Sequence, residues 1–237
     1  LWDKKSVDHS VRTRSETREA ASKDLRVATG LLDIRLIAGN ADLVAAVQLD
    51  AIEFWRKNAK ENLADLHKSL QVRHARSGEL AYLLEPDLKE ARGGLRDIQA
   101  LRAISLSAAV TVPLEKISWA EGTLNNVRES LHIASGRGKD RLLFQEQDKV
   151  AELLNYPDAD AMMSEVARAA RSVDYLLNYT WHSLEHKSRD GFGRLSKKAR
   201  VTSVAKNVSA SNREILIDPL VSLDEDPAVG LRAAATA

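Results

Sequence analysis

Residues 161–187 read AMMSEVARAARSVDYLLNYTWHSLEHK, and their apolar side chains recur every three or four positions. This spacing places them in one stripe along a helix. The stripe comprises Met162, Val166, Ala169, Val173, Leu177, Thr180 and Leu184. Pro157 and Asp158 precede it, and an aspartate at this point can cap the first turn. The sequence therefore predicts a helix of about 28 residues, roughly 40 Å long at 1.5 Å per residue.

Three shorter stripes repeat the helical spacing. They consist of Ala21, Leu25, Ala28 and Leu32, then of Ala59, Leu63, Leu66 and Leu70, and then of Ala120, Leu124, Val127, Leu131 and Ala134. Glycine (11) and proline (5) are scarce among the 237 residues, which also favours helix. Helices with one apolar stripe each and short connections bury those stripes against one another. We therefore expect a mainly α fold built on an antiparallel helical bundle.

The composition excludes several classes of protein. Hydrophobic residues make up 44% of the chain and charged residues 29%, with a formal net charge of +1, which argues against a disordered chain. The lack of cysteine excludes disulfides and thiolate catalysis and fits a reducing compartment. No apolar run reaches the roughly 18 residues of a membrane span, so we expect a cytoplasmic protein without a membrane partner. The chain begins at Leu1 without an initiator methionine, which suggests a piece of a longer protein.

Two regions depart from the helical spacing. Residues 6–13 are short, alternating and β-branched, and they predict one strand that must pair with strands not present here. Residues 201–204 and 214–217 predict a loose hairpin, and residues 224–227 predict the start of a terminal helix. The expected boundaries divide the chain into residues 1–39, 40–190 and 191–237.

Residues 82–97, YLLEPDLKEARGGLRD, hold the most specific signal, and we refer to them as the signature segment. A loop with basic residues leads through Gly93 and Gly94 into a helix. Glycines at such a point let the backbone approach a ligand, and unpaired N–H groups of the first helical turn attract anions. Lys89, Arg92 and Arg96 add cations suited to phosphate. The segment therefore predicts a phosphate-binding site.

The same residues also have structural interpretations. A double glycine is a common turn, and charged side chains near a helix start are most often solvated. Arg96 and Asp97 could instead lock neighbouring helices together, in which case their loss would reduce stability. His74, beside Arg73, could contact phosphate or belong to a solvated helix end.

The signature segment resembles the Pro-(Asn/Asp)-(Ile/Leu)-Lys-x-x-x-Gly-Gly-Leu-Arg-Asp-Ile motif of the bacterial bifunctional PII uridylyltransferase/uridylyl-removing enzymes. A related Gly-Gly-x-Arg-x-Ile-Glu motif occurs in the glutamine synthetase adenylyltransferase. Further blocks follow in the family's order at residues 1–3, 9–13, 24–29, 35–39, 73–74 and 140–144. The resemblance covers nearly the whole chain, most firmly residues 1–187.

This resemblance implies part of a nucleotidyltransferase. Residues 1–39 would end a nucleotidyltransferase domain of the DNA-polymerase-β type, residues 40–190 would form the helical domain, and residues 191–237 would form a β-containing tail. The parent would transfer UMP, or AMP in some lineages, from UTP or ATP to a tyrosine of the nitrogen-signalling protein PII. The Gly-Ser and Asp-x-Asp motifs of the transferase and the His-Asp pair of the hydrolase are not in this sequence. The chain by itself is therefore expected to be inactive.

The resemblance also implies site residues. In such enzymes three carboxylates hold two Mg²⁺ ions, which align the α-phosphate, the tyrosine and the leaving pyrophosphate. Asp8, on the expected strand, is the candidate third carboxylate and hence a catalytic and metal-binding residue; a solvent-facing strand position is the alternative. Arg12 would neutralise phosphate or pair with Asp8. The expected nucleotide-binding residues are Arg12, Lys89, Arg92, Gly93, Gly94 and Arg96.

Three other interpretations compete with this one. A non-catalytic helical module could dock PII or bridge catalytic domains. The pattern His182-x-x-Glu185-His186 matches a zinc-protease motif, but Leu184 belongs to the apolar stripe and we expect the match to be coincidental. Residues 187–213 hold eight basic side chains and one acidic one. Acidic side chains at 214–226 balance this charge and aromatic residues are few, so nucleic acid is not the expected partner.

Overall fold

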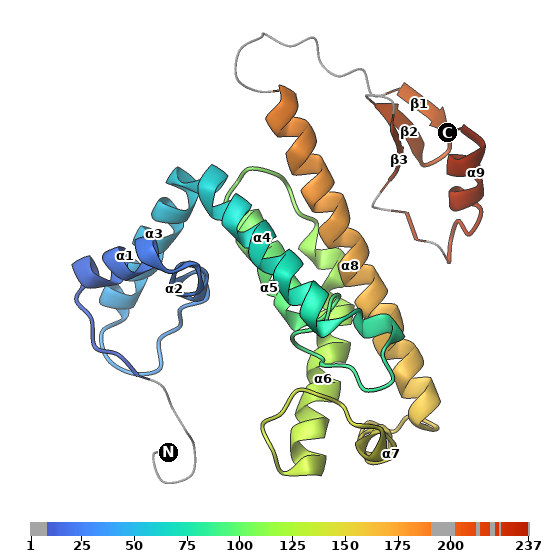
Figure 1. Cartoon of the computed structure of the whole chain (residues 1–237), viewed down its shortest axis with the longest axis horizontal. Helices are drawn as coiled ribbons and strands as arrows, with labels where there is room; N and C mark the ends of the chain where they lie inside the picture. Colours follow the sequence, from blue (N-terminus) through green and yellow to red (C-terminus); the bar gives the residue numbers. More distant parts are fainter. Residues whose placement is uncertain (1–8, 191–201, 212–213, 219–220, 223, 237) are drawn as a thin grey trace.

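The computed structural model describes residues 9–190, 202–211, 214–218, 221–222 and 224–236, with only the backbone described at 186–190, 211 and 214. Most of this part is helical, and a small antiparallel sheet lies near the C-terminus (Figure 1), which confirms the predicted fold class. Each described helix is too short or too polar to span a lipid bilayer. The boundaries of the three expected parts stay predictions.

Helix α8 (Ala159–Asp190) contains the predicted long stripe. Asp158 caps it as expected, because its Oδ1 accepts a 2.7 Å hydrogen bond from the N–H of Ala161. The stripe is buried from Met162 to Thr180. Helix α6 (Ser118–Ser135) runs antiparallel beside α8 (Figure 1), and its own stripe from Ala120 to Leu131 is buried as well.

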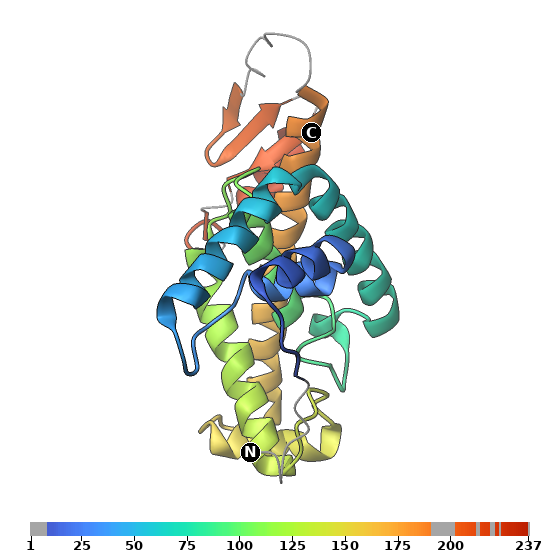
Figure 2. The same cartoon turned by 90° about the vertical axis from the view of Figure 1, so that its left-hand side faces the viewer.

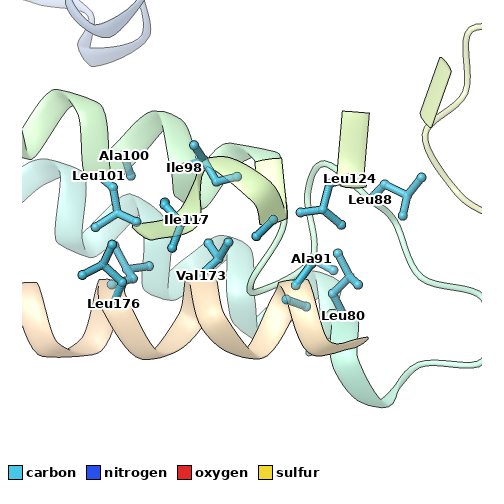
Figure 3. Packing of buried hydrophobic residues seen from close by; sticks show 14 of the residues in the cluster. Leu80, Leu88, Ala91, Ile98, Ala100, Leu101, Ile117, Leu124, Val173 and Leu176 are labelled. Carbon is cyan, nitrogen blue, oxygen red and sulfur yellow. The ribbon is translucent and has the colours of Figure 1, made fainter. Parts of the chain in front are cut away.

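Helices α4 (Ala59–Ser77) and α5 (Leu95–Leu106) complete the bundle. Figure 3 shows Val173 and Leu176 of α8 on the side that faces Leu101 of α5 and Ile117 of the short 3-10 helix η2 (Leu114–Ile117). A second 3-10 helix, η1 (Leu80–Tyr82), lies against α8, and α7 (Phe144–Leu153) packs on α6 and α8. These contacts place the signature segment between α4 and α5, beside α8.

Three helices form the N-terminal part: α1 (Arg14–Lys23), α2 (Leu25–Leu31) and α3 (Ala41–Lys57). They lie on one side of the bundle (Figure 2) and contact α4 and α5. Trp55 of α3 is fully buried, and its Nε1–H donates a 2.8 Å hydrogen bond to the carbonyl of Ala103. This indole anchors α3 to α5, because its ring is buried in the core and its N–H has a hydrogen-bond partner there.

The sequence prediction for the N-terminal part needs two corrections. The stripe expected from Ala21 to Leu32 is divided at Asp24, whose extended backbone ends α1 and whose Oδ1 accepts the N–H of Arg26 at 2.8 Å to cap α2. The strand expected at residues 6–13 is wrong for residues 9–13, which are not in a strand. There Thr13 and Glu16 form a capping box that starts α1, and a local cap competes directly with strand pairing.

The C-terminal sheet contains β1 (Thr202–Ala205), β2 (Val208–Ser211) and β3 (Glu214–Ile217), in the order β1-β2-β3. Both predicted strands are present, but the predicted hairpin between them is wrong, because β1 and β3 each pair with β2 and not with each other. The polar serines of β2 hid it from a search for apolar runs, although Val208 is buried. The terminal helix α9 (Val229–Thr236) begins later than predicted, because Asp226 accepts hydrogen bonds from Asn207 and Arg232 in the turn before it.

Candidate functional site

The signature segment is held in place at two points by backbone hydrogen bonds. Near its C-terminal end, the N–H of Arg92 donates to the carbonyl of Gly78 at 2.9 Å, and the N–H of Leu80 donates to the carbonyl of Arg92 at 3.0 Å. In its middle, the N–H of Leu88 donates to the carbonyl of Asp140 at 2.9 Å. Leu80, Leu88 and Ala91 of this region point into the core (Figure 3). The segment is therefore fixed to the bundle by backbone hydrogen bonds and by side chains buried in its core.

The two glycines serve close packing. Gly93 has a φ of +86°, and a Cβ on it would lie 2.5 Å from the carbonyl oxygen of Ala170 in α8. A Cβ on Gly94 would lie 2.8 Å from the carbonyl oxygens of Leu88 and Ala91. Both glycines are buried, so their missing side chains make room for neighbouring backbone and leave no open surface for a ligand.

The N–H groups at the start of α5 are already used. Those of Leu95 and Arg96 donate to the carbonyls of Leu88 and Lys89 at 3.0 and 3.1 Å, and that of Asp97 donates to the carbonyl of Gly94 at 3.0 Å. The expectation of unpaired N–H groups at this helix start is therefore wrong. Any anion bound here must be held by side chains.

Asp97 is the centre of a buried ionic cluster. Its Oδ1 accepts hydrogen bonds from Nη2 of Arg73 at 2.5 Å and contacts Nε2 of His74 at 2.9 Å, and its Oδ2 accepts the N–H of Gly93 at 2.6 Å. The Asp97 side chain has no exposed surface. Burial acts to raise the pKa of Asp97, but the hydrogen bond from His74 and the charge of Arg73 outweigh it, so the pKa lies below its usual value.

This cluster decides between the alternatives for three residues. Asp97 joins α5 to α4, as the structural interpretation supposed. Arg96 does not, because its Nε and Nη1 donate to Glu90 and Gln99, both close in sequence. His74 does not belong to a solvated helix end, since its ring lies against the buried Asp97.

The three cations of the signature segment point to different partners. Lys89 Nζ lies 3.8 Å from Oδ2 of Asp140, beyond hydrogen-bond distance, whereas Arg92 Nε donates to Oδ1 of Asp174 in α8 at 2.6 Å. Arg96 Nε donates to Oε1 of Glu90 at 3.2 Å. The structure therefore does not gather the three around one point, and Lys89 has the loosest ion pair of the three.

Arg92 lines a hollow of about 170 Å³ between η1 and α8. Tyr82 and Tyr175 also line it, together with Asp174, the partner of Arg92. Burial is the main cause of a raised pKa for Tyr175, whose phenol is therefore neutral at pH 7. The volume suits a single ring or a small anion better than a whole nucleotide. Sequence reasoning assigned no role to either tyrosine, because Tyr82 was only the first residue of the signature segment and Tyr175 lies outside the apolar stripe of α8.

A second ionic cluster surrounds Asp140, in the loop after α6. Its Oδ1 accepts a 2.6 Å hydrogen bond from Nε of Arg128 and contacts Nε2 of His132 at 3.0 Å, with Lys89 on the other oxygen. Burial acts to raise the pKa of Asp140, but hydrogen bonds from Arg128 and His132 bring it below its usual value. Sequence reasoning missed this cluster because its members lie up to 51 positions apart in the sequence, from Lys89 to Asp140.

The remaining predicted sites have these outcomes. Asp8 lies outside the described residues, so its catalytic and metal-binding roles stay predictions. Arg12 is exposed and precedes α1. In the part of the chain that the structure describes, no three histidine or carboxylate side chains are placed to hold a metal ion. That result covers His182 and Glu185, whereas the His186 side chain is outside the described part.

Comparison with known proteins identifies the family. The sequence matches the family described as GlnD PII-uridylyltransferase over residues 61–112 and 113–181. A bifunctional uridylyltransferase/uridylyl-removing enzyme of Streptomyces coelicolor is 40% identical over all of this chain, and one of Mycobacterium tuberculosis is 32% identical over 99% of it. The chain spans 30% of the length of each of these relatives. No solved structure matched the chain. It belongs to the GlnD PII-uridylyltransferase family.

Proposed function

We propose that this chain is part of an enzyme that transfers UMP from UTP to a tyrosine of PII, with AMP from ATP as the alternative in some lineages. The observation that carries the proposal is the family match over α4 to α8 together with 40% identity across the whole chain. The signature segment lies inside the matched region. By itself the chain is expected to be inactive, because its sequence holds neither the Gly-Ser and Asp-x-Asp motifs of the transferase nor the His-Asp pair of the hydrolase.

Within that enzyme, the cationic side chains of the signature segment would contact the nucleotide's phosphates. Lys89 suits this role best: its side chain is 32% exposed, and at 3.8 Å its ion pair with Asp140 can be exchanged for a phosphate at small cost. Arg96 is 46% exposed and can also turn outward. Arg92 would contribute through the hollow it lines, and Gly93 and Gly94 through the shape of the turn.

Mg²⁺ belongs to the proposal only through residues that the structure does not describe. The described residues hold no set of carboxylates that fits the ion, and Asp8 is the candidate ligand from the sequence. The contact between Lys89 and phosphate requires only charge and reach, so it can be tested separately.

The test uses the intact enzyme with Lys89→Ala and Arg96→Ala. Loss of one charge-assisted contact should raise the apparent KM for UTP, or lower kcat, about tenfold. Lys149→Ala and Arg102→Ala are matched controls, since both side chains are about as exposed as the Arg96 side chain and form ion pairs away from the signature segment. Steady-state UMP transfer to PII at varied UTP is the measurement. Kinetics equal to those of the controls would refute the nucleotide-binding role.

A second candidate is a non-catalytic helical module that docks PII or bridges catalytic domains. The start of α5 favours this second candidate. Neighbouring backbone fills the space beside Gly93 and Gly94, and the N–H groups of the first turn already donate to carbonyls of the same chain. This candidate predicts normal KM for UTP in both variants. Its own signature would be a changed affinity for PII measured without nucleotide.

A further inference from the structure

The ionic cluster around Asp140 brings three basic side chains to one carboxylate. Nε of Arg128 donates to Oδ1 at 2.6 Å, Nε2 of His132 contacts the same oxygen at 3.0 Å, and Nζ of Lys89 lies 3.8 Å from Oδ2. Lys89 and Arg128 alone carry more charge than Asp140 can neutralise, and a protonated His132 adds to the excess. The cluster therefore keeps a net positive charge although its carboxylate is paired.

The backbone holds these side chains together before any ligand binds. Arg128 and His132 are four positions apart on α6, so they share one face of that helix. The N–H of Leu88, the residue before Lys89, donates to the carbonyl of Asp140 at 2.9 Å, which ties the signature segment to the loop after α6. An anion that binds here therefore loses little free energy to ordering the protein.

The cations of this cluster also have donors and surface to spare. The Arg128 and His132 side chains are 29% and 28% exposed, close to the value for Lys89, whereas Asp140 is more deeply buried. A guanidinium has five N–H donors and an ammonium has three, and one of those of Arg128 is used on Asp140. Donors thus remain for a second, stronger anion on the solvent side of the carboxylate.

We infer that Arg128 and His132 complete a phosphate-binding site with Lys89, and that Asp140 occupies these cations until a phosphate arrives. The ligand is the triphosphate tail of the nucleotide, whose oxygens accept charge-assisted hydrogen bonds from the three side chains. Because the tail carries more charge than one carboxylate, it competes with Asp140 for the same donors. The inference rests on the proposed function, in which Lys89 contacts the nucleotide, and it adds two binding residues from α6.

The first measurement is the Kd of inorganic triphosphate for the intact enzyme, by titration calorimetry in EDTA so that no metal ion takes part. Arg128→Gln should raise the Kd about tenfold, because one charge-assisted contact is lost, and His132→Gln should raise it less. Asp140→Asn should lower the Kd about fivefold, because it removes the competing charge and keeps an oxygen that accepts from Arg128.

Arg102→Gln and Glu121→Gln are matched controls for these variants. Arg102 of α5 and Glu121 of α6 form a partly exposed ion pair at 2.7 Å that shares no residue with the Asp140 cluster. Each control removes one charge of such a pair and should leave the Kd for triphosphate unchanged.

The second measurement shows whether the phosphate belongs to the nucleotide. Steady-state UMP transfer to PII at varied UTP should give a raised KM in Arg128→Gln and a lowered KM in Asp140→Asn. If the Kd for triphosphate changes in these variants while the KM for UTP equals that of the controls, the cluster binds a different phosphorylated ligand. That outcome would overturn the inference.

Two outcomes of the calorimetry would overturn it as well. One is an unchanged Kd in Arg128→Gln, and a lower melting temperature in the same variant would then identify the contact with Asp140 as structural. The other is a raised Kd in Asp140→Asn, which would show that the carboxylate supports binding and does not compete. Each of these failures leaves the proposed function intact as long as the wild-type enzyme transfers UMP to PII. Absence of that transfer refutes the proposed function instead.

Discussion

The clusters around Asp97 and Asp140 are built from the same parts. Each carboxylate contacts one arginine, at 2.5 and 2.6 Å, and one histidine, at 2.9 and 3.0 Å. They differ in burial: the Asp97 side chain is fully buried between α4 and α5, whereas the Asp140 side chain is 14% exposed on a surface loop. Asp97 also accepts a hydrogen bond from the backbone N–H of Gly93, whereas Asp140 has Lys89 Nζ at 3.8 Å, beyond hydrogen-bond distance.

The difference shows how position assigns a role to one chemical group. In the buried cluster every polar atom has a partner, so the ionic contacts hold two helices and the glycine turn in one arrangement. In the exposed cluster the excess of cations leaves Lys89 able to change partner. The first is suited to structure and the second to binding.

The largest expected change in stability comes from removing each carboxylate in turn. Asp97→Ala should cost about 3–5 kcal/mol of unfolding free energy, because Arg73 would stay buried without its counter-charge. Asp140→Ala should cost only about 1 kcal/mol, since its cations can turn to water. Urea denaturation followed by circular dichroism measures both. Equal losses for the two variants would contradict the division into structural and binding clusters.

A smaller effect is expected from the turn that serves the buried cluster. Gly93→Ala places a side chain at φ +86°, which costs about 1–3 kcal/mol, and it also presses on the Ala170 carbonyl. Gly138→Ala is the matched control in the exposed loop, because no atom lies within 4 Å of its added Cβ. Thermal melts of both variants are the measurement. If Gly93→Ala has the same melting temperature as Gly138→Ala, close packing on α8 is not the reason for a glycine at position 93.

The smallest effect concerns acid pH. Both carboxylates have pKa values lowered by folding, so in acid the unfolded chain binds more protons and stability rises with pH. The contribution is complete above the unfolded pKa of about 3.9 and is lost as the pH falls through the folded value. We therefore expect the stability gap between wild type and Asp97→Asn to narrow as the pH falls below about 4. Urea midpoints measured from pH 7 to pH 3 test this, and a gap that widens in acid would reverse the assigned sign.

The apolar spacing was sufficient to predict the bundle. The stripes of α4, α6 and α8 are buried at the expected positions, because a helix with one apolar face has few ways to hide it. Local hydrogen bonds that compete with the spacing were harder to foresee. The cap at Asp24 divided one expected helix, and the capping box at Thr13 replaced part of an expected strand.

The signature segment shows the other limit of sequence reasoning. Its residues match the family motif, and the match identified the family correctly. The physical reason offered for the glycines, an open helix start, was wrong. A Cβ on residue 93 would lie 2.5 Å from the carbonyl oxygen of Ala170. Ala170 follows Gly93 by 77 positions in the sequence, so the residues around Gly93 give no sign of this neighbour.

The sequence by itself determined the helical class, the long central helix and the family, because periodicity and motif letters are properties of neighbouring residues. Only the tertiary structure decided which carboxylate is buried, which cation is loosely held and which apolar side chains remain exposed. Those properties depend on contacts such as Arg73 with Asp97 and Lys89 with Asp140, between residues that folding alone brings together. Exposure and partner distance set the strength of a charge interaction, and both exist only in the folded chain.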